Sequence, residues 1–169
     1  IRTSRANPTK NDKLMDNVVK TLIELSITDF VTIGGDDTAY SASCLSKYAL
    51  KKFNQNINVV GVPKTIDNDL SETDDTVGFD TSINIIAEEL DRLHTTAKSH
   101  HRVIIAEIMG RHAGWMTLYG GIAGGAHVIL IPEEQMSLEE LTSILETQYE
   151  RNGYAIIAAS EGFKLIVEE

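Results

Sequence analysis

The stretch that decides the fold is Asn58-Val59-Val60-Gly61-Val62-Pro63-Lys64-Thr65-Ile66-Asp67-Asn68-Asp69. Its apolar first half predicts a short buried strand, which Pro63 is expected to end by stopping sheet pairing. A cation, a hydroxyl and two carboxylates then follow within a few residues. Carboxylates this close repel each other in a dry cleft unless a metal, a lysine or a substrate proton lies nearby, and phosphoryl transfer supplies such groups. The alternative is a solvated turn rich in Asp and Asn.

Three more polar segments each follow another predicted strand, which favours a binding site over a plain turn. The expected strands are 30–33, 59–62, 102–109, 128–131 and 154–159, and the expected helices are 11–25, 38–53, 79–98, 112–124 and 137–152. The polar segments are Gly34-Gly35-Asp36-Asp37-Thr38, Met109-Gly110-Arg111 and Ser160-Glu161-Gly162. Strands that alternate with helices predict an α/β fold of three layers, αβα, with a mainly parallel sheet. Ligands bind such sheets at the carboxyl ends of the strands, where all of these segments lie.

Each helix is expected to turn one apolar face toward the sheet, because apolar residues recur at helical spacing. The expected faces are Leu14, Val18, Leu22 and Leu25; Ala42, Leu45, Ala49 and Phe53; and Phe79, Ile83, Ile86, Leu90 and Leu93. Ser137 and Glu140 predict a capping box. The glycines between His112 and Gly124 predict close backbone packing.

Composition narrows the class of protein. A chain of 169 residues with 42% hydrophobic residues suits one globular domain, and 1–169 is expected to be one catalytic region without an internal boundary. The net charge of −10 argues against a nucleic-acid or an anionic membrane partner. Cys44 is the only cysteine, so no intrachain disulfide can form. Without an apolar run long enough to span a membrane, the protein is expected to be cytoplasmic.

Together with Thr3-Ser4-Arg5, these segments resemble the phosphofructokinase family in order and spacing, from about Thr3 to Phe163. The resemblance implies a Mg²⁺-dependent transfer of a phosphoryl group to the 1-hydroxyl of fructose 6-phosphate, which gives fructose 1,6-bisphosphate in glycolysis. It also implies that the intact protein is a homo-oligomer. Family members carry a glycine-rich phosphate loop before this region and a basic segment after it. The chain is therefore expected to be a fragment that is inactive by itself.

The resemblance assigns Asp67 as the general base that takes the proton of the sugar hydroxyl. Thr65 would bind the phosphoryl oxygens or the sugar, and Arg111 would neutralise charge on the transferred group, although a plain surface arginine is the alternative. Asp69 would support the loop or the waters of the metal. The other substrate residues implied by the family pattern are Arg102, which would reach the 6-phosphate of a neighbouring subunit, Met109, Gly110 and Glu161. For Arg102, a solvated strand end is the alternative.

The glycine pair Gly34-Gly35, between a strand and a helix, indicates a phosphate cradle. Asp36 within it is assigned to Mg²⁺, with a helix cap as the alternative. The donor-binding residues implied by the resemblance are Arg5, Gly35, Asp37, Thr38 and Lys64. In the family's ATP-using members a glycine stands at the position of Asp37, and often at that of Lys64. The pyrophosphate-using members look like this chain, with lysine holding the transferred group, so pyrophosphate is the expected donor. An ATP-dependent phosphofructokinase and a non-catalytic phosphosugar-binding or assembly fragment remain as alternatives.

Overall fold

The computed structural model describes residues 6–166, and the chain divides into two compact units, Ile1–Lys64 and Thr65–Glu169. No linker-like composition marks this division in the sequence. Within 6–166, none of the helices is long and apolar enough to cross a membrane.

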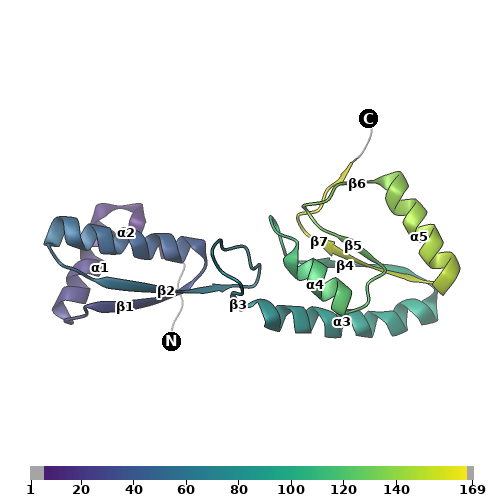
Figure 1. Cartoon of the computed structure of the whole chain (residues 1–169), viewed down its shortest axis with the longest axis horizontal. Coiled ribbons are helices and arrows are strands. Elements are labelled where there is room, and N and C mark those ends of the chain that lie inside the picture. Colours follow the sequence, from purple (N-terminus) through teal and green to yellow (C-terminus); the bar gives the residue numbers. More distant parts are fainter. Residues whose placement is uncertain (1–5, 167–169) are drawn as a thin grey trace. The chain divides into compact units, whose positions relative to one another are not determined.

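The first unit is a parallel strand pair with two helices (Figure 1). Its elements are the 3-10 helix η1 (Pro8–Lys10), α1 (Asp12–Glu24), β1 (Asp29–Gly34), α2 (Asp36–Phe53) and β2 (Asn58–Thr65), the last residue of which begins the second unit. β1 and β2 are parallel, in register from Asp29 opposite Asn58 to Gly34 opposite Pro63. Both strands and both helices were expected from the sequence.

The sequence prediction that Pro63 ends sheet pairing is wrong. β2 continues through Pro63 and Lys64, and Pro63 is paired in register with Gly34. A proline lacks only its own N–H, so it can occupy a strand position at which that donor is not part of the ladder. The polar segment therefore begins as strand and bends only after Thr65.

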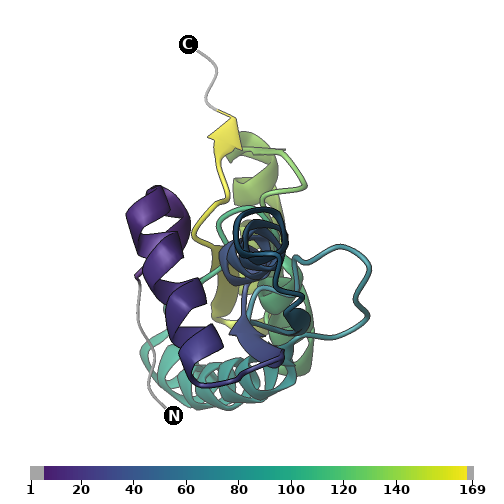
Figure 2. The same cartoon turned by 90° about the vertical axis from the view of Figure 1, so that its left-hand side faces the viewer.

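The buried face of α1 agrees with the sequence prediction at Leu22, and Val18 packs against the same core, but the prediction is wrong for Leu14 and Leu25. Met15, Val19 and Leu22 are buried, whereas Leu14 and Leu25 are exposed. Both sets have helical spacing, so contacts with α2 decide between them; Figure 2 shows α1 beside α2.

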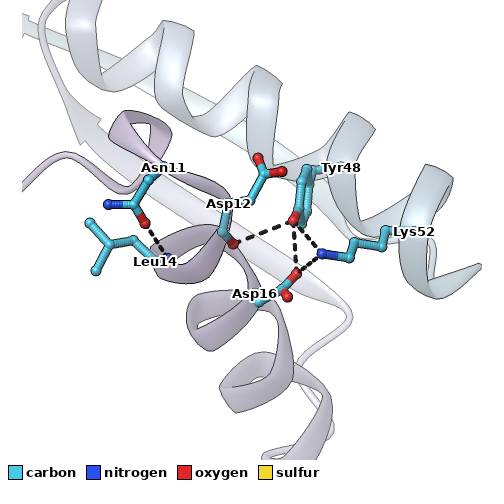
Figure 3. Close-up of polar contacts among 6 residues, drawn as sticks. All are labelled: Asn11, Asp12, Leu14, Asp16, Tyr48 and Lys52. Atoms are coloured by element: carbon cyan, nitrogen blue, oxygen red, sulfur yellow. Dashed lines mark hydrogen bonds and ion pairs between the residues drawn. The ribbon is translucent and has the colours of Figure 1, made fainter.

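Polar contacts join the two helices beside this apolar face (Figure 3). The Tyr48 hydroxyl of α2 donates to Asp16 Oδ1 at 2.8 Å, and Lys52 Nζ lies 2.7 Å from the same oxygen. The Asp16 side of α1 therefore lies against α2.

In the first unit the described helices cover the sheet on one face only. Phe30 and Val59 pack into a core with the buried residues of α1 and α2, and the predicted α2 face of Ala42, Leu45 and Ala49 is confirmed. On the other face of the strands, Val31, Ile33 and Val60 are exposed. The expected third layer is thus not present among the described residues of this unit.

The second unit contains the remaining elements. They are β3 (Val77–Gly78), α3 (Phe79–His100), β4 (Val103–Ile108), α4 (Trp115–Ala123), β5 (Val128–Leu130), β6 (Met136–Ser137), α5 (Leu138–Asn152), β7 (Ala155–Ser160) and β8 (Leu165–Ile166). The main sheet has the order β4-β7-β5, with both pairs parallel. The short parallel pair β6-β8 was not predicted, because two residues leave no periodic pattern.

Three layers are formed in this unit, as Figure 1 shows. Ile156 and Ala158 of β7 pack with α3 and α4, and Ile157 packs with Leu141 of α5. The capping box of Ser137 and Glu140 is confirmed. So is the close packing of α4, because a Cβ on Gly120 would lie 2.5 Å from Ile86 of α3. The α/β class with parallel sheets is confirmed, although the strands form separate sheets rather than one.

Candidate functional site

The two glycines at the end of β1 have different roles. A Cβ on Gly34 would lie 2.3 Å from Thr38 Oγ1, so the packing of Thr38 requires a glycine there. A Cβ on Gly35 would meet only the Lys64 carbonyl oxygen, at 3.9 Å, which is an ordinary contact. The fold therefore has room for a side chain at Gly35, and its absence leaves the backbone open to a ligand.

The open backbone at Gly35 leads directly into α2. Gly35 is the N-cap residue of α2 and offers no side-chain cap, so the first turn carries amides and a helix dipole that favour an anion. Asp36 and Asp37, the first two helical residues, are exposed, and Asp36 Oδ1 accepts the N–H of Asp37 at 2.8 Å. Because Gly35 and not Asp36 is the N-cap residue, the helix-cap alternative for Asp36 is not supported, and its exposed carboxylate is accessible to a cation.

Asp36 fits a magnesium ion that arrives with its substrate. Mg²⁺ usually keeps several waters and is held by one or two carboxylates together with substrate phosphates. Among residues 6–166 no group of three or more His, Cys, Asp or Glu side chains is arranged to hold a metal. A single exposed carboxylate at Asp36 could hold such an ion only together with groups of the substrate.

Lys64 lies at the end of β2, next to the glycine turn. Its side chain is exposed, and its carbonyl oxygen is the atom nearest to a Cβ on Gly35. The first unit therefore brings together Gly35, the acidic first turn of α2 and the backbone of Lys64. Thr38, half-buried, packs against Gly34, and Arg5 lies outside the described residues.

The second unit begins with a loop in which Thr65 and Asp67 contact each other. The Thr65 hydroxyl lies 3.3 Å from Asp67 Oδ2, to which it can donate, and it accepts the backbone N–H of Asp67 at 3.2 Å. Asp67 is half-buried, and within the described chain Thr65 is the only hydrogen-bond partner of its carboxylate. The carboxylate is thus oriented by one neighbour and still available to a substrate.

Ile66 anchors this loop to the core of the second unit. It packs against the cluster that contains Phe79 and Ile108, and its Cγ2 lies 3.3 Å from where a Cβ on Gly78 would be. Since Ile66 points into the core, the flanking Thr65 and Asp67 are left at the surface of the unit.

The carboxyl ends of β4 and β7 are fixed to each other by backbone contacts. The Glu161 N–H donates to Ile108 O at 2.8 Å, and the Gly162 N–H donates to Gly110 O at 3.3 Å. A Cβ on Gly162 would lie 2.1 Å from Arg111 O, so only glycine fits there. Gly110 has φ +136°, and a Cβ on it would lie 2.7 Å from Ala113 O.

These contacts hold the segments Met109–Arg111 and Ser160–Gly162 side by side, as the sequence predicts for the ends of parallel strands. Met109, Arg111 and Glu161 expose their side chains there, while Gly110 is buried. A cation, a carboxylate and an apolar side chain at one edge suit a sugar phosphate, and the individual roles stay predictions.

Arg102 is at the opposite end of β4. It is exposed just before Val103, the first residue of β4, so the strand separates it from Met109 by about 20 Å at 3.3 Å per residue. Arg102 therefore does not belong to the group at the carboxyl ends of its own strands. A role toward a neighbouring subunit stays a prediction.

Three residues that hold these loops were not identified from the sequence. Asn68 and Thr76 close the loop after Thr65, and Glu133 Oε1 accepts the N–H of Gly114 at 2.8 Å, before α4. Only Asn68 has a sequence signal, since asparagine tolerates the left-handed conformation that it adopts here, with φ 52°. Asp69, for which loop support was predicted, is exposed, and the bonds across the loop are made by Asn68 and Thr76.

Comparison with known proteins gives a consistent result. The family model described as Phosphofructokinase matches residues 1–169. A relative from Amycolatopsis mediterranei, named pyrophosphate–fructose 6-phosphate 1-phosphotransferase, is 46% identical over 96% of this chain and 46% of its own length. A relative from Mycobacterium tuberculosis, named ATP-dependent 6-phosphofructokinase, is 42% identical over 96% of this chain and 46% of its own length. The chain thus spans about half the length of the curated relatives it matches.

Solved structures agree with these relatives. The pyrophosphate-dependent phosphofructokinase from Marinobacter aquaeolei superposes with a TM-score of 0.83 at 32% identity, over 92% of this chain and 42% of that protein. The phosphofructokinase from Saccharomyces cerevisiae superposes with a TM-score of 0.87 at 29% identity, over 96% of this chain and 25% of that protein. With a family match over its whole length and the same fold, this chain belongs to the phosphofructokinase family.

Proposed function

We propose that the protein containing this chain transfers a phosphoryl group from pyrophosphate to the 1-hydroxyl of fructose 6-phosphate. The observation that carries this proposal is the Asp67 carboxylate, half-buried and oriented by Thr65, in the loop that follows the exposed Lys64. A base that is oriented yet accessible to substrate is what transfer to a sugar hydroxyl requires. Phosphofructokinase relatives 46% identical to this chain support the choice of sugar.

In the proposed reaction Asp67 accepts the proton of the 1-hydroxyl while that oxygen forms a bond to phosphorus. The bond from this phosphorus to the bridging oxygen of pyrophosphate breaks, and the products are fructose 1,6-bisphosphate and inorganic phosphate. The positive charges of Lys64 and Arg111 stabilise the negative charge of the transferring group. Thr65 positions Asp67 and can donate to a phosphoryl or sugar oxygen when substrate is bound.

Mg²⁺, held by Asp36 when bound with the donor, would offset the negative charge of pyrophosphate. Gly35 and the first turn of α2 supply backbone amides to the donor phosphates, and Thr38 supports that turn by its contact with Gly34. Arg5 would complete the donor site.

The sugar is assigned to the edge formed by β4 and β7. Glu161 accepts hydrogen bonds from sugar hydroxyls, Met109 lines the ring, and Gly110 allows close approach. Arg111 acts near the transferred group, and Arg102 of a neighbouring subunit binds the 6-phosphate in a homo-oligomer.

Pyrophosphate is preferred to ATP because of Asp37. Its exposed carboxylate, on the first turn of α2, would repel the additional α-phosphate of a nucleotide. ATP remains the second candidate, because relatives 42% identical to this chain are named ATP-dependent.

The test is the initial rate with each donor at saturating fructose 6-phosphate and Mg²⁺, using the protein expressed from its full reading frame. Wild type should use pyrophosphate in preference to ATP. Asp37→Gly should shift the donor ratio toward ATP by about a hundredfold, and Lys64→Gly should mainly lower the pyrophosphate rate. A wild type that prefers ATP would make ATP the donor, and an unchanged ratio in Asp37→Gly would remove Asp37 as the reason for the preference.

A non-catalytic role is tested separately. Calorimetric titration with fructose 6-phosphate, with and without pyrophosphate and Mg²⁺, should detect sugar binding alongside turnover. Sugar binding with no turnover of either donor would support a phosphosugar-binding protein in place of an enzyme.

A further inference from the structure

Thr76, just before β3, is a buried polar residue, with 4% of its surface exposed. Its hydroxyl lies 2.6 Å from the backbone carbonyl oxygen of Thr65 and 3.1 Å from Asn68 Oδ1. A hydroxyl has one proton to donate, and the shorter contact indicates that Thr65 O receives it. Asn68 Oδ1 instead accepts the backbone N–H of Thr76, at 2.9 Å.

Asn68 completes the closure of this loop. It adopts a left-handed conformation with φ 52°, and its Nδ2 donates to Asp74 O at 3.2 Å. Thr76 therefore makes hydrogen bonds on both sides of Asp67. Its hydroxyl binds the backbone carbonyl of Thr65, and its N–H binds the side chain of Asn68.

The Asp67 carboxylate itself depends on these neighbours. Within residues 6–166 its only hydrogen-bond partner is the Thr65 hydroxyl, at 3.3 Å from Oδ2. Its direction is thus set by where Thr65 and Asn68 hold the backbone, and the buried hydroxyl of Thr76 fixes the first of these two positions.

We propose that Thr76 is a positioning residue for the reaction: its hydroxyl holds Thr65, and through Thr65 it holds Asp67 in the orientation needed to accept the sugar proton. This inference rests on the proposed function, in which Asp67 is the base. Removing the hydroxyl leaves the Thr65 carbonyl without this donor, and the loop can then shift. A displacement of about 1 Å in a catalytic group can cost about a hundredfold in rate.

The test is Thr76→Val in the full-length protein, because valine keeps the shape and removes the hydroxyl. The expected kcat is about 10- to 100-fold lower per folded molecule, with the folded fraction taken from thermal unfolding at the assay temperature. The KM for fructose 6-phosphate should change less than about threefold, because Met109, Gly110, Arg111 and Glu161, which are assigned to the sugar, lie at the ends of β4 and β7 and do not contact Thr76. Thr76→Ser, which restores the hydroxyl, should recover most of kcat.

Thr117→Val is the matched control. Thr117 is fully buried in α4 of the same unit, and its hydroxyl has no hydrogen-bond partner in the described part of the chain. Thr117→Val makes the same change of side chain but breaks no hydrogen bond. The kcat of this variant should therefore equal that of wild type. Unchanged kcat in Thr76→Val, or a loss that Thr76→Ser does not recover, would overturn the proposal.

A double-variant comparison separates positioning from general destabilisation. If Thr76 acts through Asp67, then Thr76→Val should lower kcat by less than about twofold in an Asp67→Ser background. A full 10- to 100-fold loss in that background would show that Thr76 acts by another route and would overturn the proposal.

The outcome can also be distinguished from a failure of the proposed function. If wild type turns over neither donor, the function fails, and the positioning claim is then tested by hydrogen exchange at the amides of Asp67 and Thr76. Faster exchange at both amides in Thr76→Val than in Thr117→Val would support the holding role. Equal exchange would overturn it.

Discussion

The end of β1 and the paired ends of β4 and β7 are both built from glycines at the carboxyl ends of parallel strands, but they use them differently. At Gly35 a Cβ would meet one atom at 3.9 Å, whereas at Gly162 it would lie 2.1 Å from the Arg111 carbonyl oxygen. The first end is open, with room for a side chain at Gly35. The second is fixed by the protein's own backbone, so it presents Arg111 and Glu161 in a set geometry before any substrate binds.

The largest expected effect is at Asp67, which lies in neither strand end and is the proposed base. Asp67→Ser should lower kcat by about a thousandfold or more, because the proton of the sugar hydroxyl loses its acceptor. Fructose 6-phosphate binding, measured by calorimetry, should persist. A variant with normal turnover would remove Asp67 from the mechanism.

A side chain at Gly162 should destabilise the fixed end. Gly162→Ala should destabilise the protein by about 1–3 kcal/mol or more, because the new Cβ overlaps a backbone carbonyl that cannot move freely. The measurement is the unfolding midpoint in urea, with Gly35→Ala as the matched control at the open end. Equal midpoints for the two variants would contradict the contrast between the ends.

A smaller effect is expected from Arg102, which lies far from the group at the carboxyl ends of its own strands. Arg102→Ala should raise the KM for fructose 6-phosphate by about tenfold, because the 6-phosphate loses a charge-assisted contact. Hybrid oligomers of Arg102→Ala and Asp67→Ser subunits should regain activity through mixed sites. A fully active monomer would contradict a shared site.

The smallest effect concerns the stability of the unit that carries the open end. A hydrogen bond from Lys52, followed by one from Tyr48, lowers the pKa of the Asp16 carboxyl below its usual 3.8, and the bond from Asp16 in turn raises the pKa of Lys52. Because the pKa of Asp16 is lower in the folded state, the charged carboxylate stabilises the fold fully at pH values above its unfolded-state pKa. This stabilisation is lost as the pH falls through the folded-state pKa.

Asp16→Asn should therefore have a lower unfolding temperature than wild type at neutral pH, and the difference should shrink as the pH falls through the lowered folded-state pKa of Asp16. Glu88→Gln, which removes one of the exposed ion pairs of Arg92, is the control and should change little at neutral or acidic pH. A difference that persists unchanged in acid would exclude the Asp16 charge as its source.

The contrast between the two ends also explains which features could be predicted from sequence. The strand ends and most helices follow from local periodicity and from glycine positions, which is why the segments at Gly35, Arg111 and Glu161 were placed at strand ends. Leu14 and Leu25 of α1 were wrongly expected to be buried, because helical spacing alone does not tell which of two adjacent faces packs against α2.

Features that depend on contacts across a loop were also missed. Thr76 binds Thr65, eleven residues earlier, and nothing in its local sequence indicates a buried hydroxyl. The continuation of β2 through Pro63 depends on its pairing with Gly34, which only the neighbouring strand determines.

In the proposed function the open end, at Gly35, binds the phosphate donor, and the fixed end, at Gly162, binds the sugar. The most direct measurement is a pair of KM values, for pyrophosphate and for fructose 6-phosphate, in Gly35→Ala and in Glu161→Gln of the full-length protein. Gly35→Ala should raise the pyrophosphate KM by about tenfold or more and leave the sugar KM unchanged, since its methyl group occupies space that the donor needs. Glu161→Gln should raise the fructose 6-phosphate KM and leave the pyrophosphate KM unchanged. If both variants change the same KM, or if Gly35→Ala changes neither, the assignment of the two ends is wrong.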